Sequence, residues 1–357
     1  MLETLNSWYK KYFSDPQAVV LTIILVVGFT VVLTMGKMLT PVLAAVVIAY
    51  LLEGIVRKLE QLEVPSLTAV ILVFIAFFIF VIFLVFGVVP LLSVQVTGFI
   101  KELPQVLSVT RETLMQLPEH YGYISEKQVQ DMADTMDREI ASSGQQILTV
   151  SLASIPGLIT LLVYLILVPL LVFFFLKDKA LILSWFSSLL PRDRSLASRV
   201  WHDMDLQLGN YVRGKFWEIL IVGSVTYVAF AILDLKYAIL LAALVGVSVL
   251  VPYIGAAVVT VPVAIVAYFQ FGWGTDFAIV LIVYGIIQAL DGNVLVPLLF
   301  SEVVNLHPIA IIVSVLVFGG LWGFWGVFFA IPLATLVNAV LHAWPRAPEP
   351  AAPAEES

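Results

Sequence analysis

Residues 288–335 read QALDGNVLVPLLFSEVVNLHPIAIIVSVLVFGGLWGFWGVFFAIPLAT, and this stretch decides how the chain must fold. It is apolar enough to lie within a bilayer, yet polar side chains, prolines and glycines occur in it together. An acidic group at membrane depth is costly, and helix-breaking residues free backbone groups that lipid cannot satisfy. Such a sequence is stable only where protein or a water-lined cavity surrounds it. It therefore predicts a translocation or binding site made from broken helices, with interfacial loops at helix ends as the alternative.

The candidate pathway residues of this stretch carry a polar side chain or a helix-breaking ring: Gln288, Asp291, Asn293, Pro297, Glu302 and His307. We expect Asp291 to bind a proton or a cation, because burial favours the neutral carboxyl and no basic residue is nearby in sequence. Gln288, Asn293 and carbonyls freed near Pro297 would coordinate a polar ligand. Pro297 is expected to break the helix between Asp291 and Glu302. The alternative for Asp291 is a helix cap or a solvated acid facing a lumen.

The composition places the chain in a membrane. Hydrophobic residues make up 61% of the 357 residues and charged residues 12%, against a usual charged share of about 25%. A soluble protein could not cover that much apolar surface, so we predict an all-α, multi-pass integral membrane protein. The chain has no cysteine, its four histidines are far apart, and it has no P-loop, zinc-protease or dinucleotide-binding motif. We therefore expect no metal, no cofactor and no enzymatic activity, and any transport would be secondary or passive.

Hydropathy and charge divide the sequence into six regions. These are 1–92 with an interfacial helix and three membrane segments, 93–150 as an extracytoplasmic helical domain, 151–176 as a fourth segment, 177–215 as a basic amphipathic region, 216–345 as a C-terminal transport bundle, and 346–357 as a disordered tail. Within the first region, the apolar runs 19–35 and 38–52 are each slightly short of the ~20 residues of a span. They predict a tight hairpin.

Charge orients these regions across the membrane. Residues 177–215 contain seven basic residues, whereas 93–150 contain eight acids and four basic residues. By the positive-inside rule the basic region is cytoplasmic and the acidic one is outside, where it could bind an envelope protein. The basic helix would rest on anionic membrane lipids or pack on the bundle. Both termini are then cytoplasmic.

Two further segments are expected to be re-entrant helical hairpins that line one cavity. The first, 238–271, is interrupted at 251–255, and the second, 308–342, is interrupted at 319–323. The residues expected to make or permit these breaks are Pro252, Tyr253, Gly255, Gly319, Gly320, Gly323 and Gly326. If both segments are hairpins, the whole chain has eight apolar units. If each half of a segment is a separate span, the chain crosses the membrane ten times.

Several motifs resemble the autoinducer-2 exporter family of membrane permeases, and within it the PerM-type permeases of Gram-negative bacteria. The motifs are GNYVRGK (209–215), VPYIGA (251–256), QALDGNVLVP (288–297), NLHP (305–308) and FGGLWGFWGVFFAIPLA (318–334). The resemblance extends over nearly the whole chain. It implies about eight transmembrane segments in the bacterial inner membrane, a homo-oligomer and elevator-like movement of the C-terminal bundle. In the first motif, which falls in the basic region, the candidate functional residues are Asn210, Tyr211, Arg213 and Lys215.

Three functions are compatible with this sequence. The first is secondary transport or export of a small polar solute. The second is exchange of a monovalent cation for protons at Asp291 and Glu302. The third is a non-transport or lipid-handling role in the envelope, with the acidic region binding a partner. The net charge of −7 gives no reason to expect nucleic-acid binding.

Overall fold

A computed structural model describes residues 16–102, 155–188, 195–300 and 306–343, together with the single residues 130 and 135. Throughout these ranges the regular structure is helical, without a strand. Among the described residues, six stretches are long and apolar enough to cross a membrane: Val19–Gly36, Met38–Gln61, Ser66–Glu102, Val200–Ile232, Ile254–Phe271 and Thr275–Phe300. The chain is therefore an all-α, multi-pass membrane protein, as the composition predicted.

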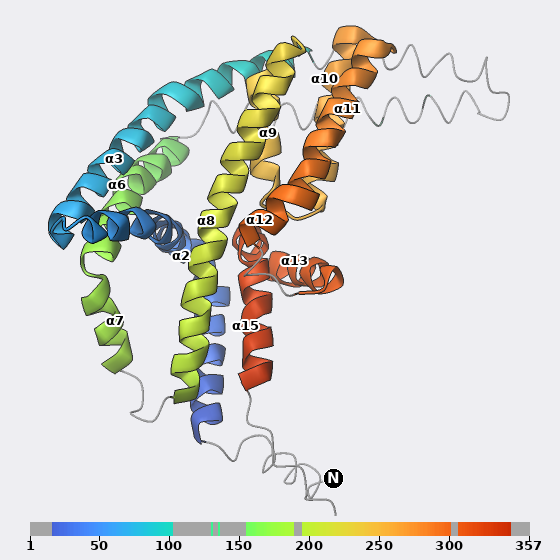
Figure 1. Cartoon of the computed structure of the whole chain (residues 1–357). Helices are drawn as coiled ribbons and strands as arrows, with labels where there is room; N and C mark the ends of the chain where they lie inside the picture. The colour runs from blue at the N-terminus through green and yellow to red at the C-terminus, as the bar shows by residue number, and fades with distance from the viewer. Residues whose placement is uncertain are drawn as a thin grey trace, which may run out of the picture.

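Figure 1 labels the helices in chain order. They are α2 (Pro16–Gln61), α3 (Ser66–Phe83), the π-helical turn η1 (Leu84–Val88), α6 (Ile155–Lys177), α7 (Lys179–Ser188), α8 (Ser195–Ile232), α9 (Ala238–Ser248), α10 (Ile254–Phe271), α11 (Thr275–Leu290), the π-helical turn η2 (Asp291–Leu295), α12 (Val296–Phe300), α13 (Pro308–Trp322), α14 (Phe324–Phe328) and α15 (Ala330–Ala343).

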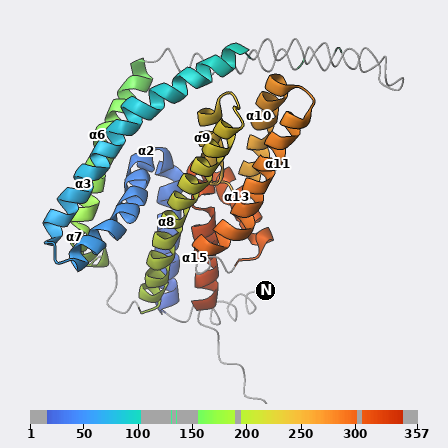
Figure 2. The same ribbon diagram turned by 45° about the horizontal axis from the view of Figure 1, so that its top comes forward.

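The predicted hairpin at 19–52 is wrong. Gly36 and Lys37 lie inside α2, one helix of 46 residues. The helix bends, so that its first half runs beside α15 and its second half turns toward α3 and α6 (Figures 1 and 2). Pro41 lies within α2, where its ring removes a backbone donor and crowds the preceding turn, which bends a helix without ending it. A single glycine beside a lysine is too weak a signal to stop a helix of this hydrophobicity.

The second half of α2 packs with α3 and α6 as an outer layer. Buried apolar residues join the three helices, among them Ala45 of α2, Val70 of α3 and Val172 of α6. The helix that starts at Ser66 continues through η1 to Glu102. The predicted boundary at residue 92 therefore falls inside a helix, because apolar residues continue on the far side of it.

Helix α8 runs through the middle of the molecule and contacts α2, α9, α11, α12 and α15. It joins the predicted basic region and the span that follows, so residue 215 is not the end of an element. Its closest neighbour is α9. A Cβ atom on Gly246 would lie 3.0 Å from the Ile219 carbonyl oxygen, so glycine is needed where these two backbones meet.

Both predicted interruptions are present as turns between helices. Helices α9 and α10 meet at residues 249–253, where Tyr253 has φ of 63°, and a Cβ on Gly255 would lie 1.8 Å from the Ser248 carbonyl oxygen. At 11 residues, α9 is about 16 Å long, roughly half the thickness of a bilayer core. It therefore cannot cross a membrane by itself.

The second turn lies at the last residue of the predicted interruption, 319–323. Gly319 and Gly320 are within α13, which ends at Trp322, and the chain turns at Gly323 with φ of 62°. Gly326 then lies against α13, since a Cβ there would be 1.8 Å from the Phe318 carbonyl oxygen. Only glycine adopts the backbone angles of residue 323 without strain, whereas adjacent glycines inside an apolar helix lower its stability without ending it.

Residues 1–15, most of 93–150 and the tail 346–357 lie outside the described residues. The interfacial helix, the fold of the extracytoplasmic domain and the disorder of the tail therefore stay predictions.

Candidate functional site

A buried ion pair lies in the middle of α8. The Nζ atom of Lys215 is 2.7 Å from Oε2 of Glu218, and the two side chains are 5% and 2% exposed. The same ammonium donates to the Val249 carbonyl at 2.8 Å and lies 5.2 Å from the centre of the Phe300 ring. Lys215 thus joins α8 to the α9–α10 turn and to α12. Charged groups this deep in an apolar protein are stable only when they are paired.

Asp291 lies beside this pair at the start of η2. Its carboxyl group is within electrostatic range of both Lys215 and Glu218. Its Oδ1 atom is buried and has no hydrogen-bond partner among the described residues, and the same is true of Nε2 of Gln288, one turn earlier. Lys215, Glu218 and Asp291 therefore form a group of one cation and two acids, and the described part of the chain supplies no second cation to Asp291. We call these three residues the charged group.

The helix that carries Asp291 is interrupted by a π-helical turn rather than by a break at Pro297. The N–H of Val296 donates to the carbonyl of Asp291, five residues back. Pro297 follows inside α12 and has no N–H, so the extra residue of the π turn accommodates a proline that an α-helix would resist. Asn293 is exposed and its amide donates to the Ala289 carbonyl at 2.8 Å, so it caps its own helix instead of facing the charged group.

Residues of the GNYVRGK motif (209–215) contact α12 and α14 next to this group. The hydroxyl of the buried Tyr211 donates to the Phe328 carbonyl at 2.8 Å. Pro332 would be the helical donor to that carbonyl and has no N–H, so Tyr211 replaces it. The Phe300 ring packs on Gly214, where a Cβ would be 2.6 Å from the ring. The motif therefore fixes α12 and α14 against α8, within the packed core and not at an exposed cytoplasmic surface.

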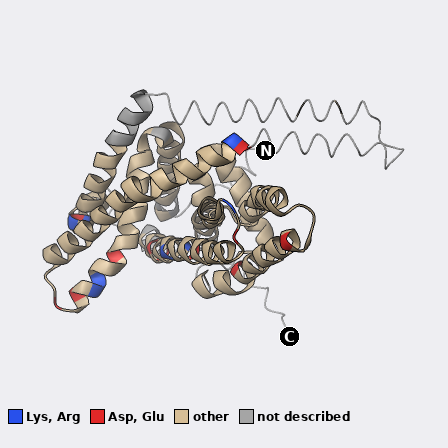
Figure 3. Cartoon of the chain, turned by 90° about the horizontal axis from the view of Figure 1, so that it is seen from above, with Lys and Arg blue, Asp and Glu red and all other residues tan. Residues whose placement is uncertain are grey.

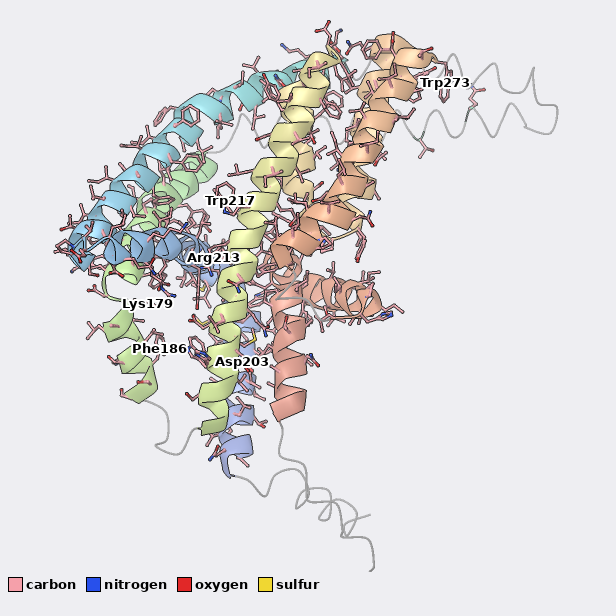
Figure 4. The ribbon with its side chains drawn as sticks, in the orientation of Figure 1. Lys179, Phe186, Asp203, Arg213, Trp217 and Trp273 are labelled. Atoms are coloured by element: carbon pink, nitrogen blue, oxygen red, sulfur yellow. The ribbon has the colours of Figure 1, made fainter. Side chains whose placement is uncertain are left out.

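The remaining residues of the motif face another way. Figure 4 shows Arg213 leaving α8 on the side of α2 and α7. Its guanidinium donates to the Asn210 side chain at 2.9 Å and lies against Gly54 of α2. Nearby, the Tyr50 hydroxyl donates to Asp205 at 2.6 Å. These contacts join α2 to α8. Over the rest of the ribbon charged residues are sparse (Figure 3).

Of the other predicted pathway residues, His307 does not reach the charged group. His307 is the exposed N-cap of α13, where its Nδ1 accepts from the Ile309 N–H at 3.2 Å. Glu302 lies outside the described residues. The turn at 249–253 adjoins the charged group through Val249, whereas the turn at Gly323 does not, so the structure gives no support for a single cavity lined by both. A cavity of about 40 Å³ lies elsewhere, between residues 99–102, the turn between α8 and α9, and α10.

Trp322 is half-buried against α2. Its Nε1–H donates to the Val32 carbonyl of α2 at 3.0 Å. A Cβ on Gly36 would lie 2.4 Å from that nitrogen, so Gly36 leaves the space for the indole. The contact fixes the end of α13 to the first half of α2.

Sequence reasoning missed Glu218. It lies three residues after Lys215, so the two face each other across one helical turn. An acid within the apolar run that starts at Phe216, directly after a lysine, was the available signal. Within the described ranges no group of three or more histidine, aspartate or glutamate residues could hold a metal ion.

Comparison with known proteins identifies the family to which the chain belongs. The model of the AI-2E family transporters matches residues 21–346. The chain belongs to the AI-2E transporter family. An Escherichia coli (strain K12) protein named as a permease, PerM, is 49% identical over 346 residues, which cover 97% of this chain and 98% of the relative. A Bacillus subtilis (strain 168) protein named as a transport protein, YueF, is 26% identical over 306 residues, 84% of this chain and 82% of the relative. This AI-2E family member is therefore a membrane transport protein by family, and the charged group is its candidate site.

Proposed function

We propose that the chain is a secondary transporter of a small polar solute, and that the charged group binds the coupling ion. The observation that carries this proposal is the charge of the group. One ammonium and two carboxylates leave one negative charge in excess inside an apolar bundle. Such an excess is costly unless a proton or a cation neutralises it.

The ion that fits this excess is a proton or a monovalent cation. Lys215 already neutralises Glu218, so one positive charge completes the group. In the part of the chain that the structure describes, Oδ1 of Asp291 and Nε2 of Gln288 lack a partner, and they are the atoms we assign to that ion or to the solute it accompanies. The carbonyl oxygens near the π turn offer further acceptors, since Pro297 cannot donate to them.

Several features support the proposal that ion binding at the charged group is coupled to movement of the C-terminal bundle. Lys215 contacts three elements, and two of them adjoin a turn or a π-helical segment. A change in the charge of Asp291 would alter the partners of Lys215 and so the positions of the α9–α10 turn and α12. We further propose an inner-membrane location with both termini cytoplasmic, from the distribution of basic residues, and a homo-oligomer, from the family resemblance.

Exchange of a cation for protons is a second candidate, because the same charged group would suffice without a solute. The two are separated in liposomes that contain the purified chain and a trapped pH-sensitive dye. An imposed sodium gradient that drives proton movement without added solute indicates exchange. Uptake of a labelled polar solute that depends on the proton or sodium gradient indicates coupled transport.

The matched control is Asp291→Asn, which keeps the side-chain volume and removes the charge. The proposal predicts gradient-dependent flux in the wild type and its loss in Asp291→Asn. No flux of protons, sodium or solutes in either protein would reject transport at this site and favour an envelope or lipid-handling role.

A further inference from the structure

The far end of the helix that begins at Ser66 docks on the turn between α8 and α9. Oε1 of Gln95 accepts a hydrogen bond from the Leu240 N–H at 2.9 Å. That N–H is in the first turn of α9, and the N-cap residue Tyr237 makes no side-chain cap of its own. The first turn of a helix needs an acceptor for its free N–H groups. Gln95 supplies it from another helix.

Tyr237 makes the other half of the contact. Its ring packs on Gly98, where a Cβ would lie 3.2 Å from a ring carbon, and it meets the Phe99 ring edge-on at 5.7 Å. Burial and a hydrogen bond to Glu102 raise the pKa of Tyr237, so its hydroxyl remains a donor. Glu102 also pairs with Lys236 at 3.7 Å.

The turn that receives these contacts has an unfavourable backbone. Asp234 and Tyr237 have φ of 50° and 57°, in the left-handed region that side chains disfavour. Gln270 of α10 holds the turn from the other side: its Nε2 donates to the Asp234 carbonyl at 2.6 Å and its Oε1 accepts from the Lys236 N–H at 2.7 Å. Backbone of this kind persists only where its surroundings hold it, and it is frequent in segments that switch.

The end of the long helix is exposed at this contact, whereas Ile100, two residues before Glu102, is buried. Glu102 and Lys236 are 46% and 60% exposed, and the cavity of about 40 Å³ lies beneath the contact. Between this contact and the packed start of α3 lies η1, which has no buried residue. A π-helical turn interrupts the regular bonding of a helix, and such turns are frequent at functional sites and can kink a helix.

We propose that residues 95–102 are a latch, which docks on the α8–α9 turn in one conformation of the protein and releases it in another. The helix pivots at η1 while residues 66–83 stay packed on α2 and α6. Gln270 keeps the turn attached to α10, so the latch and not the turn is the part that separates. This inference does not depend on which ion the charged group binds.

Distance measurements between spin labels test the latch, and the absence of cysteine in the natural chain makes labelling specific. We would label Val94→Cys together with Ile232→Cys in the full chain in liposomes, because both side chains are exposed and neither takes part in the contacts described above. The expected result is two distances, one docked and one longer. Gln95→Ala should raise the ratio of undocked to docked molecules about fivefold, the effect of losing one neutral hydrogen bond. Gln95→Glu keeps the acceptor and should not raise it.

The control pair is Ile232→Cys with Trp273→Cys, at the end of α8 and on the α10–α11 connection, where Trp273 is exposed (Figure 4). It should give one distance that Gln95→Ala leaves unchanged. A single docked distance in both the wild type and Gln95→Ala would overturn the proposal. Equal broadening of the two label pairs would also overturn it, because that result assigns the movement to the turn.

Discussion

Replacement of Lys215 by methionine tests whether the ion pair in α8 is what allows Glu218 to be buried. Methionine keeps most of the length and the apolar stem of lysine and removes the charge. Glu218 is then left 2% exposed without its counter-ion. Breaking a buried pair by removing one partner typically costs about 3–5 kcal/mol. The Val249 carbonyl also loses its donor at 2.8 Å.

The assay is equilibrium unfolding in mixed micelles, with a double-mutant cycle. Lys215→Met should lower the free energy of unfolding by about 3–5 kcal/mol. Lys215→Met with Glu218→Gln should be more stable than Lys215→Met alone, because residue 218 no longer carries a buried charge without its counter-ion. Lys179→Met is the matched control: its partner Glu53 is also bonded by Arg57 and is 18% exposed, so a loss of at most about 1 kcal/mol is expected. Strictly additive effects of Lys215→Met and Glu218→Gln would show that the two side chains do not stabilise each other.

Three further predictions concern the helix junctions. Gly326→Ala places a Cβ 1.8 Å from a backbone oxygen and should lower the free energy of unfolding by about 3 kcal/mol or more. The control Gly320→Ala meets nothing within 4 Å and should stabilise α13 by up to about 1 kcal/mol. Both are measured by the same unfolding assay. Tyr211→Phe leaves the Phe328 carbonyl without a donor and should cost about 1–3 kcal/mol, and a neutral result would contradict this role. Pro297→Ala should reduce transport by removing the need for the π turn without shifting its pH dependence, and a shifted pH profile would contradict that separation of roles.

The sequence predicted the class of fold and the position of most helices, because apolar runs of membrane length are stable almost only as helices that span a bilayer. It also placed the two turns near residues 252 and 323, where proline or glycine must interrupt a helix. It failed at Gly36, since glycine inside a hydrophobic helix can serve close packing, here against Trp322, as readily as a turn. Local sequence does not distinguish these two uses.

The candidate site was predicted in part. Asp291 lies beside buried charges. The side chains of Asn293 and His307, however, hydrogen-bond to backbone groups of their own helices, and Glu218 was not predicted. The reason is that the partners of Asp291 come from residues about 75 positions earlier, and a tertiary contact of this kind has no signature in hydropathy or spacing. Lys215 also looked like a cytoplasmic residue because a basic side chain is usually exposed.

The pH dependence of flux in Asp291→Asn is the most direct test of the proposed coupling site. We would reconstitute the wild-type chain, Asp291→Asn and the control Asn293→Ala in liposomes with a trapped pH-sensitive dye. Imposed proton and sodium gradients would drive flux from about pH 5 to about pH 9, a range that brackets the titration of a buried carboxyl. We predict that flux in the wild type and in Asn293→Ala changes with pH, whereas Asp291→Asn is expressed normally and its residual flux no longer depends on pH. Wild-type flux and pH dependence in Asp291→Asn would contradict the proposed coupling and make Asp291 a structural residue.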